Sequence, residues 1–252
     1  MRLFFLGLLG IPFFPLLARS EVTTTIDETR ALAANGEVIV ENVNGPVHVE
    51  TWDKPEVHLV AVKSARTEAD LKALDVQIDA TDARLTVKSV YLEKDGSWIK
   101  KFTNTGEVRY TLTVPHTATL RRIETLNGPV EIANAHARVT AKSMNGRVEA
   151  RGLRDEVQLT SVNGEVSAEF DSVAPRQDIV LETVNGGISL RLPASAGVEL
   201  SASTVNGSIA NDFGPPPRNE KWIGQRLETT VGDGTARVRL KTTNGSIEIR
   251  KR

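Results

Sequence analysis

Two glutamates stand at equivalent places in consecutive 18-residue units of the chain. Glu131 and Glu149 each follow an Asn-Gly pair, four residues after Asn127 and Asn145. If the units stack as neighbouring strands, the carboxylates lie about 4.8 Å apart, a spacing that suits a retaining glycosidase. The next units carry serine at the same position, which favours a solvated outward column instead. We therefore predict no catalytic residue.

The remaining chemistry-bearing residues are dispersed. His48, His58, His116 and His136 show no i, i+2 or i, i+4 pairing, so a histidine metal site would need convergence of distant segments. The chain has no cysteine, which excludes disulfides and thiolate metal sites. No nucleophile elbow, phosphate loop or dinucleotide fingerprint occurs. We expect a protein that is not an enzyme and needs no metal or cofactor.

Aromatic residues gather in two stretches that break the regular pattern. Tyr91, Trp98 and Phe102 lie among lysines, and Phe213 and Trp222 flank a proline-rich run. Clustered exposed aromatics mark protein or sugar partners, which makes these five residues candidate partner contacts. The alternative is that they cover the open ends of a repeat structure.

The elements that must position these residues come from one recurring unit. A strand-forming run is followed by Ser or Thr, one further residue, Asn-Gly and a second strand-forming run, as in LTSVNGEVSA at 159–168. The earliest copy, VENVNGPVHV at 40–49, has Asn in place of the hydroxyl residue. The repeat asparagines are Asn44, Asn127, Asn145, Asn163, Asn185, Asn206 and Asn244. A period near 20 residues indicates stacked units.

Four columns of the repeat are apolar: six and four residues before each Asn, and three and five after it, with isolated exceptions. Asn-Gly is also the strongest two-residue hairpin signal, so an antiparallel meander or sandwich with Asn-Gly hairpins satisfies these columns. A parallel β-helix with Asn-Gly corners satisfies them too, and its stacked asparagines could bond along a ladder.

The residue before Asn separates the two architectures. It is apolar in six of seven copies: Val43, Leu126, Met144, Val162, Val184 and Val205, with Thr243 as the exception. A hairpin points this column away from the core, whereas a solenoid corner can turn it inward. We therefore predict an all-β parallel β-helix (solenoid) with rungs of about 18–22 residues, and keep the meander as the alternative.

The chain divides into three regions. Residues 1–20 have one basic residue, Arg2, ahead of an apolar run, and small residues before position 21, which is typical of a cleaved signal peptide; a retained anchor is the alternative. Residues 21–120 form a more irregular N-terminal β region, with a capping box at Thr67 that predicts a short helix near 68–75. Residues 121–252 form the Asn-Gly repeat region, with a surface excursion at 211–226.

Charge limits the class of partner. The whole chain has a formal net charge of −1, and removal of residues 1–20 takes away only the basic Arg2 and Arg19. Nothing in this balance recruits nucleic acid or an anionic membrane surface. No apolar run after residue 20 is long enough to span a bilayer, so we expect no membrane insertion of the mature chain.

The repeat and the closing run IGQRLETTVGDGTARVRLKTTNGSIEI at 223–249 resemble a β-strand-repeat family of unknown function grouped with adhesins. That group is related to the head domain of autotransporter adhesin-like proteins, and the similarity covers roughly 36–250. It implies a secreted or envelope protein with a β-helical body and supplies no catalytic residue.

These observations predict an exported, non-enzymatic β-repeat protein of the periplasm, cell surface or medium, acting as an adhesin-like envelope scaffold or a binding module for a protein or polysaccharide. A carbohydrate-active β-helix enzyme and an envelope-stress signalling partner are the alternatives.

Overall fold

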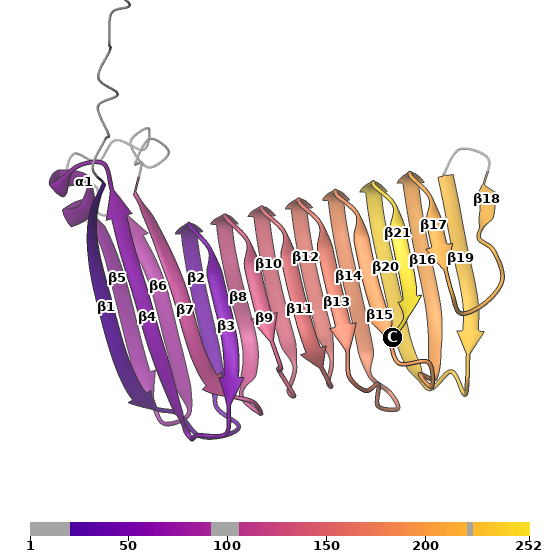
Figure 1. Cartoon of the computed structure of the whole chain (residues 1–252), viewed down its shortest axis with the longest axis horizontal. Coiled ribbons are helices and arrows are strands. Elements are labelled where there is room, and N and C mark those ends of the chain that lie inside the picture. The colour runs from indigo at the N-terminus through magenta and orange to yellow at the C-terminus, as the bar shows by residue number, and fades with distance from the viewer. Residues whose placement is uncertain (1–20, 92–105, 221–223) are drawn as a thin grey trace, which may run out of the picture.

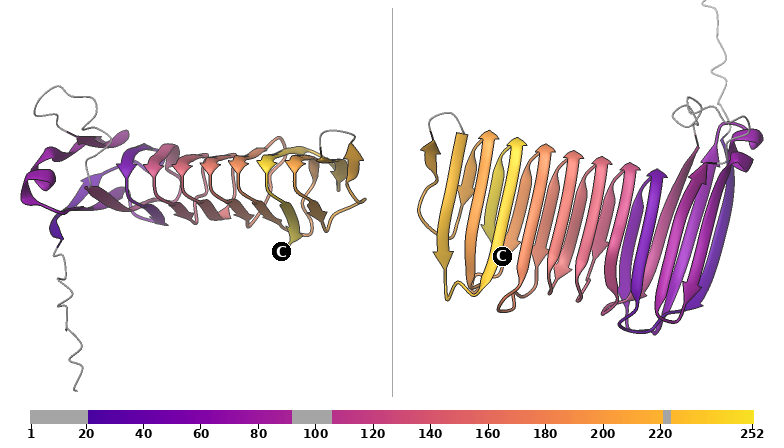
Figure 2. Two further views of the ribbon diagram at one scale, coloured as in Figure 1. Left: turned by 90° about the horizontal axis from the view of Figure 1, so that it is seen from above. Right: turned by 180° about the vertical axis from the view of Figure 1, so that it is seen from behind.

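The described residues form an elongated stack of strands in two facing layers (Figures 1 and 2). The computed structural model describes residues 21–91, 106–220 and 224–252. The predicted signal peptide, most of the 91–102 aromatic stretch and Trp222 lie outside these residues. The prediction of an all-β chain is confirmed within the described part, where one short helix accompanies two mixed sheets.

The first layer, sheet A, has ten strands in the spatial order β1 (Val22–Ala31), β4 (Glu56–Ala65), β7 (Glu107–Pro115), β3 (Val47–Trp52), β9 (Val130–Ala133), β11 (Val148–Leu153), β13 (Val166–Phe170), β15 (Ile188–Leu192), β21 (Ile247–Lys251) and β17 (Ile209–Asn211). The second layer, sheet B, has eleven strands in the order β18 (Arg218–Glu220), β19 (Gly224–Val231), β16 (Val198–Asn206), β20 (Ala236–Asn244), β14 (Asp178–Asn185), β12 (Val157–Asn163), β10 (Val139–Asn145), β8 (Thr119–Asn127), β2 (Glu37–Asn44), β6 (Arg84–Tyr91) and β5 (Leu74–Thr81).

Each Asn-Gly unit joins a strand of sheet B to a strand of sheet A. The two strands that flank Asn145-Gly146, β10 and β11, lie in different sheets and pair with the corresponding strands of neighbouring units. This pairing is parallel and keeps equivalent residues in register, as Asn145 opposite Asn163 shows. The Asn-Gly hairpin alternative is therefore wrong for these units, since a hairpin would pair β10 with β11.

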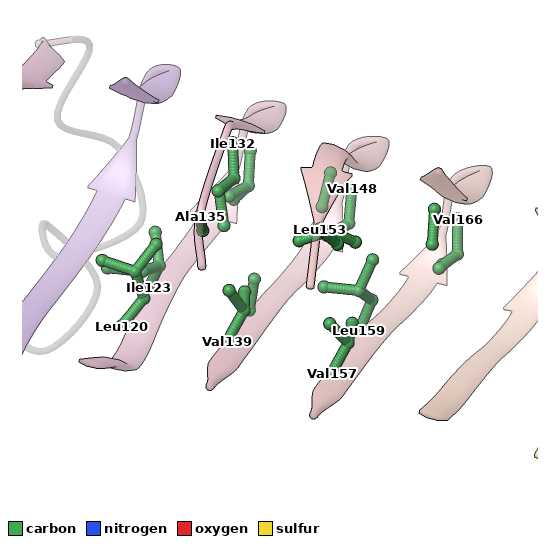
Figure 3. Close-up of a cluster of buried hydrophobic side chains, with 14 of the residues drawn as sticks. Leu120, Ile123, Ile132, Ala135, Val139, Val148, Leu153, Val157, Leu159 and Val166 are labelled. Carbon is green, nitrogen blue, oxygen red and sulfur yellow. The ribbon is translucent and has the colours of Figure 1, made fainter. Parts of the chain in front are cut away.

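The interior between the sheets is filled by the four predicted apolar columns. Figure 3 shows their side chains pointing into the space between the layers, among them Ile123, Val139, Val148 and Leu159, and all four are buried. Side chains alternate between the two faces of a strand, so the intervening residues face outward. One continuous cluster of buried side chains extends from Leu32 to Ile249 along the chain.

The structure corrects the argument that separated the two architectures. The residue before Asn does not turn inward: Met144, Val184 and Val205 are 42%, 43% and 43% exposed. The sheet B strands continue as far as Asn, so alternation holds and this column faces outward. The hydroxyl residue one place earlier faces inward instead, and Ser143 is fully buried.

Both ends of the stack depart from chain order. The β20–β21 unit lies between the β14–β15 and β16–β17 units, although it comes last in the sequence. At that end β19 pairs antiparallel with β16 and β18 with β19. At the other end antiparallel pairs β1–β4 and β5–β6 close the sheets, beside α1 (Glu68–Ala73), whose cap Thr67 accepts a hydrogen bond from the Asp70 amide. These additions stop the parallel ladder at each end.

Candidate functional site

A ladder of asparagine side chains runs along one edge of the stack, the Asn-Gly edge. Each Nδ2 donates to the Oδ1 of the next asparagine toward the N-terminal end, over 2.7–2.9 Å. In spatial order the ladder contains Asn44, Asn127, Asn145, Asn163, Asn185, Asn244 and Asn206. The predicted bonding between stacked asparagines is confirmed. It ends where Asn44 donates to the Tyr91 hydroxyl at 2.9 Å.

A second, buried ladder lies just inside the first. The hydroxyl two residues before Asn donates to the glycine carbonyl of the neighbouring unit, for example Ser161 to Gly146 at 2.9 Å and Thr183 to Gly164 at 2.9 Å. The same bond recurs at Thr125, Ser143, Thr204 and Thr242 over 2.8–3.1 Å. These bonds satisfy carbonyls at the corner, and unsatisfied buried polar groups are costly.

The glycines of the corner leave no room for a side chain. A Cβ on Gly186 would lie 2.1 Å from the Gly164 carbonyl oxygen, and the Gly164 position repeats this at 2.2 Å from Gly146. Because the obstructing atom is backbone, a side chain would force neighbouring units apart. Asn, Gly and the hydroxyl residue are therefore architectural, since each contacts the neighbouring unit.

The two glutamates singled out by their spacing are indeed neighbours on the outer face of sheet A. Glu131 lies opposite Glu149 in the β9–β11 pairing. Arg147 forms an ion pair with Glu131, and Arg151 lies 3.3 Å from Glu149. The hydrogen bond from Arg147 lowers the pKa of Glu131. A glycosidase acid needs a raised pKa, so the electrostatics at Glu131 are opposite to those of that role.

A shallow polar groove lies beside this pair on the outer face of sheet A. Its volume is about 320 Å³, and it is lined by residues of β11, β13 and β15 and the corners before them: Arg147, Glu149, Ala150, Arg151, Glu165, Ser167, Ala168, Glu169, Ser189 and Arg191. Ser167 and Ser189 pair in register and supply short side chains between longer charged ones. We call this hollow the sheet A groove. It presents hydroxyls flanked by charges of both signs.

The structure brings together two histidines that the sequence left apart. The His116 and His136 rings meet edge to face with centroids 4.8 Å apart, on the edge opposite the Asn-Gly corners. His116 Nδ1 lies 2.8 Å from an Asp53 carboxylate oxygen. Burial, reinforced by Arg154 and His116, lowers the pKa of His136. Among the described residues, no group of three or more His, Asp or Glu has metal-binding geometry.

Of the five aromatic candidates for partner contact, Tyr91 and Phe213 are described. Tyr91 is half-buried and donates to the Gly106 carbonyl at 2.9 Å. Phe213 packs against the core near the other end of the stack, with the Lys251 ammonium 5.3 Å from its ring centroid. They do not meet. Trp98, Phe102 and Trp222 lie outside the described residues, so the partner-contact role of all five stays a prediction.

Over the described parts of the chain, no helix has the length and apolar character that crossing a bilayer requires.

Comparison with solved structures finds several that align with most of this chain. A putative cell adhesion protein from Clostridium sporogenes aligns over 91% of this chain and 100% of its own, with 12% identity and a TM-score of 0.45. A putative adhesin from Bacteroides fragilis aligns over 90% and 97%, with 15% identity and a TM-score of 0.44. A putative lipid binding protein from Parabacteroides distasonis aligns over 92% and 98%, with 12% identity and a TM-score of 0.33.

No protein of curated function matches the chain significantly. The model of the family described as Toastrack DUF4097 matches residues 10–250. This match covers almost the whole sequence and includes every Asn-Gly unit. The chain therefore belongs to the Toastrack DUF4097 family.

Proposed function

We propose that the protein is an exported, non-enzymatic binding module that uses the sheet A groove to hold an extended protein segment or polysaccharide in the cell envelope. The observation that carries the proposal is the groove itself, in which serine hydroxyls lie between arginine and glutamate side chains. Hydroxyls and paired charges suit a polar ligand, because each can exchange a water for a ligand hydrogen bond. The adhesin names of the similar structures agree with this role but do not identify a ligand.

The scaffold suits such a role because it is uniform along its length. Parallel pairing and two hydrogen-bonded ladders hold the units in one register. We further propose that this body is a parallel β-helix in the strict sense, with one strand of each unit in each sheet. Binding to an extended ligand favours a rigid surface, since little conformational entropy is lost on contact.

Export is supported by the composition of residues 1–20, which is typical of a signal peptide. The periplasm, the cell surface and the medium are the compartments that this segment allows. Cell fractionation with an antibody against the protein decides among them. Recovery of the full chain from the cytoplasm alone would end the envelope proposal.

Site-specific photocrosslinking in intact cells tests the groove. A crosslinking amino acid replaces Ser167 in the groove, and the control replaces Thr111, which is exposed on β7 of the same sheet but outside it. We expect a discrete adduct from position 167 that position 111 does not give. Ser189→Arg, which fills the groove, should abolish the adduct. Equal labelling from both positions, or none from 167, would contradict the proposal.

The competing function is a carbohydrate-active enzyme using Glu131 and Glu149. It is disfavoured by the ion pair that keeps Glu131 charged. Replacement of both residues by alanine separates the two functions. Loss of glycan turnover in the double variant would establish the enzyme, whereas unchanged behaviour removes the best catalytic pair.

A further inference from the structure

The outer face of sheet B carries an apolar stripe beside the Asn-Gly edge, interrupted by one polar residue, Thr243. Met144, Val184 and Val205 are the exposed large hydrophobic residues of the described chain, and all three belong to the column immediately before Asn. In spatial order the stripe contains Val43, Leu126, Met144, Val162, Val184, Thr243 and Val205. A contiguous apolar stripe on a polar surface is a sign of an interaction site.

Two residues further from Asn along the strands, a second column carries charges. From β8 to β20 it contains Glu124, Lys142, Thr160, Glu182 and Lys241. Within the described part of the chain none of these four charged side chains has an ion-pair or hydrogen-bond partner. Several other surface charges on this sheet are paired, as Arg122 is with Glu41 at 2.6 Å and Arg237 with Asp178 at 3.2 Å.

The order of these charges is self-complementary under a two-fold rotation. Consider a two-fold axis that runs parallel to the strands and lies above β12. It places a second copy face to face with the first and reverses the order of the strands along the stack. Each column of residues then faces the same column of the second copy. Glu124 then faces Lys241, Lys142 faces Glu182, and Thr160 faces itself. An isologous interface requires this kind of self-complementarity. A two-fold axis running along the stack above this column would instead place each charged residue against the same residue of the second copy, so like charges would meet.

The apolar stripe agrees with the same rotation. Met144 faces Val184 and Val162 faces its own copy, so the largest exposed apolar groups cover each other. At the rim, Arg122 faces Arg239, and the Glu41 carboxylate already compensates Arg122. Seven strands at about 4.8 Å and seven positions at about 3.3 Å give a footprint of roughly 780 Å² from each copy. The total of about 1,550 Å² is close to the standard size for specific complexes.

We propose that the protein forms a face-to-face homodimer through the outer surface of sheet B, centred on β12. The stacks of the two copies run in opposite directions. The sheet A groove of each copy then faces away from the interface. The two sheet A grooves thus lie on opposite sides of the dimer, and this arrangement does not depend on whether the groove binds its proposed ligand.

Charge reversal tests both the dimer and its orientation. In Lys142→Glu, the new glutamate of each copy faces Glu182 of the other copy, so two negative charges meet. In Glu182→Lys, the new lysine of each copy faces Lys142 of the other copy, so two positive charges meet. Each single variant should therefore dissociate, with a rise of about tenfold or more in the dissociation constant. An equimolar mixture of the two variants should form a heterodimer, because every 142–182 contact is then attractive again.

The measurement is sedimentation equilibrium on the protein purified in the form the cell makes. The control Glu165→Lys reverses an exposed charge on the corner before β13 of sheet A and should leave the dimer intact. Circular dichroism confirms that each variant is folded. A monomeric wild type at 100 µM would overturn the proposal. So would a dimer that is unaffected by both variants, or variants that fail to recombine in the mixture.

Discussion

The two long edges of the stack differ in regularity and in what they hold. At the Asn-Gly edge every unit after the first repeats one set of contacts: asparagine to asparagine, hydroxyl to glycine carbonyl, and glycine against glycine. At the opposite edge the turns vary, and side chains such as Asp53, His116 and His136 meet there without repeating. The repeated contacts of the Asn-Gly edge fix the register of the strands. The variable turns of the opposite edge bring titratable side chains together.

The largest effect is expected at a glycine of the regular edge. Gly186→Ala would place a Cβ 2.1 Å from the Gly164 carbonyl oxygen, whereas a Cβ on the adjacent Gly187 has its nearest neighbour at 3.3 Å. We expect Gly186→Ala to lower the free energy of unfolding by at least about 3 kcal/mol, or to prevent folding. Gly187→Ala should cost less than about 1 kcal/mol. Urea unfolding of both variants measures the difference, and equal losses would refute the close-approach argument.

The buried hydroxyl ladder should have the next largest effect. Ser161→Ala removes the hydrogen bond to the Gly146 carbonyl and should cost about 1–2 kcal/mol in urea unfolding. Ser161→Thr should be nearly neutral, because threonine makes the same bond at position 183. Ser167→Ala, on the outward face of sheet A, serves as the control. A loss at Ser167 as large as that at Ser161 would show that the hydroxyl contact is not the cause.

The exposed asparagine ladder should contribute less than the buried one. Asn163→Ala breaks the bonds to Asn145 and from Asn185, which water can partly replace. We expect a loss of about 0.5–1 kcal/mol, measured against Gln158→Ala on the same strand. If the loss exceeded that of Ser161→Ala, the ranking of the two ladders would be reversed.

The smallest effect is expected at the variable edge and depends on pH. Because burial lowers the pKa of His136 in the folded state, the unfolded chain binds a proton more readily than the folded one as pH falls below the ordinary histidine value of 6.5. Stability is thus retained above this pH and falls as the pH drops through 6.5. Unfolding at pH 7.5 and 5.5 should show a larger drop for the native chain than for His136→Asn. Equal drops would remove His136 as a cause.

Sequence reasoning predicted the regular edge well, because its columns recur in every unit. The four apolar columns and the asparagine ladder needed only alternation and a constant register. The role given to the residue before Asn was wrong, since strand alternation continues through Val162 up to Asn163. The hydroxyl column was overlooked because Ser161 finds its acceptor in a neighbouring unit rather than nearby in sequence.

The variable edge and the stack ends were harder to predict. His116 and His136 are 20 residues apart, close to the repeat period, and this spacing is the signal that could have paired them. The insertion of β20 between β14 and β16 leaves no trace in the repeat columns, because each unit there fits either neighbour.

The parallel stacking of Asn-Gly units is tested most directly by disulfide formation between engineered cysteines, in a chain that has none of its own. Glu149 and Ser167 are parallel-register neighbours on sheet A, at a separation that a disulfide can span. Lys142 and Glu149 would be neighbours in an Asn145-Gly146 hairpin but lie in different sheets. Mild oxidation should crosslink a 149/167 cysteine pair and not a 142/149 pair. Crosslinking of the 142/149 pair instead would contradict the stacked architecture.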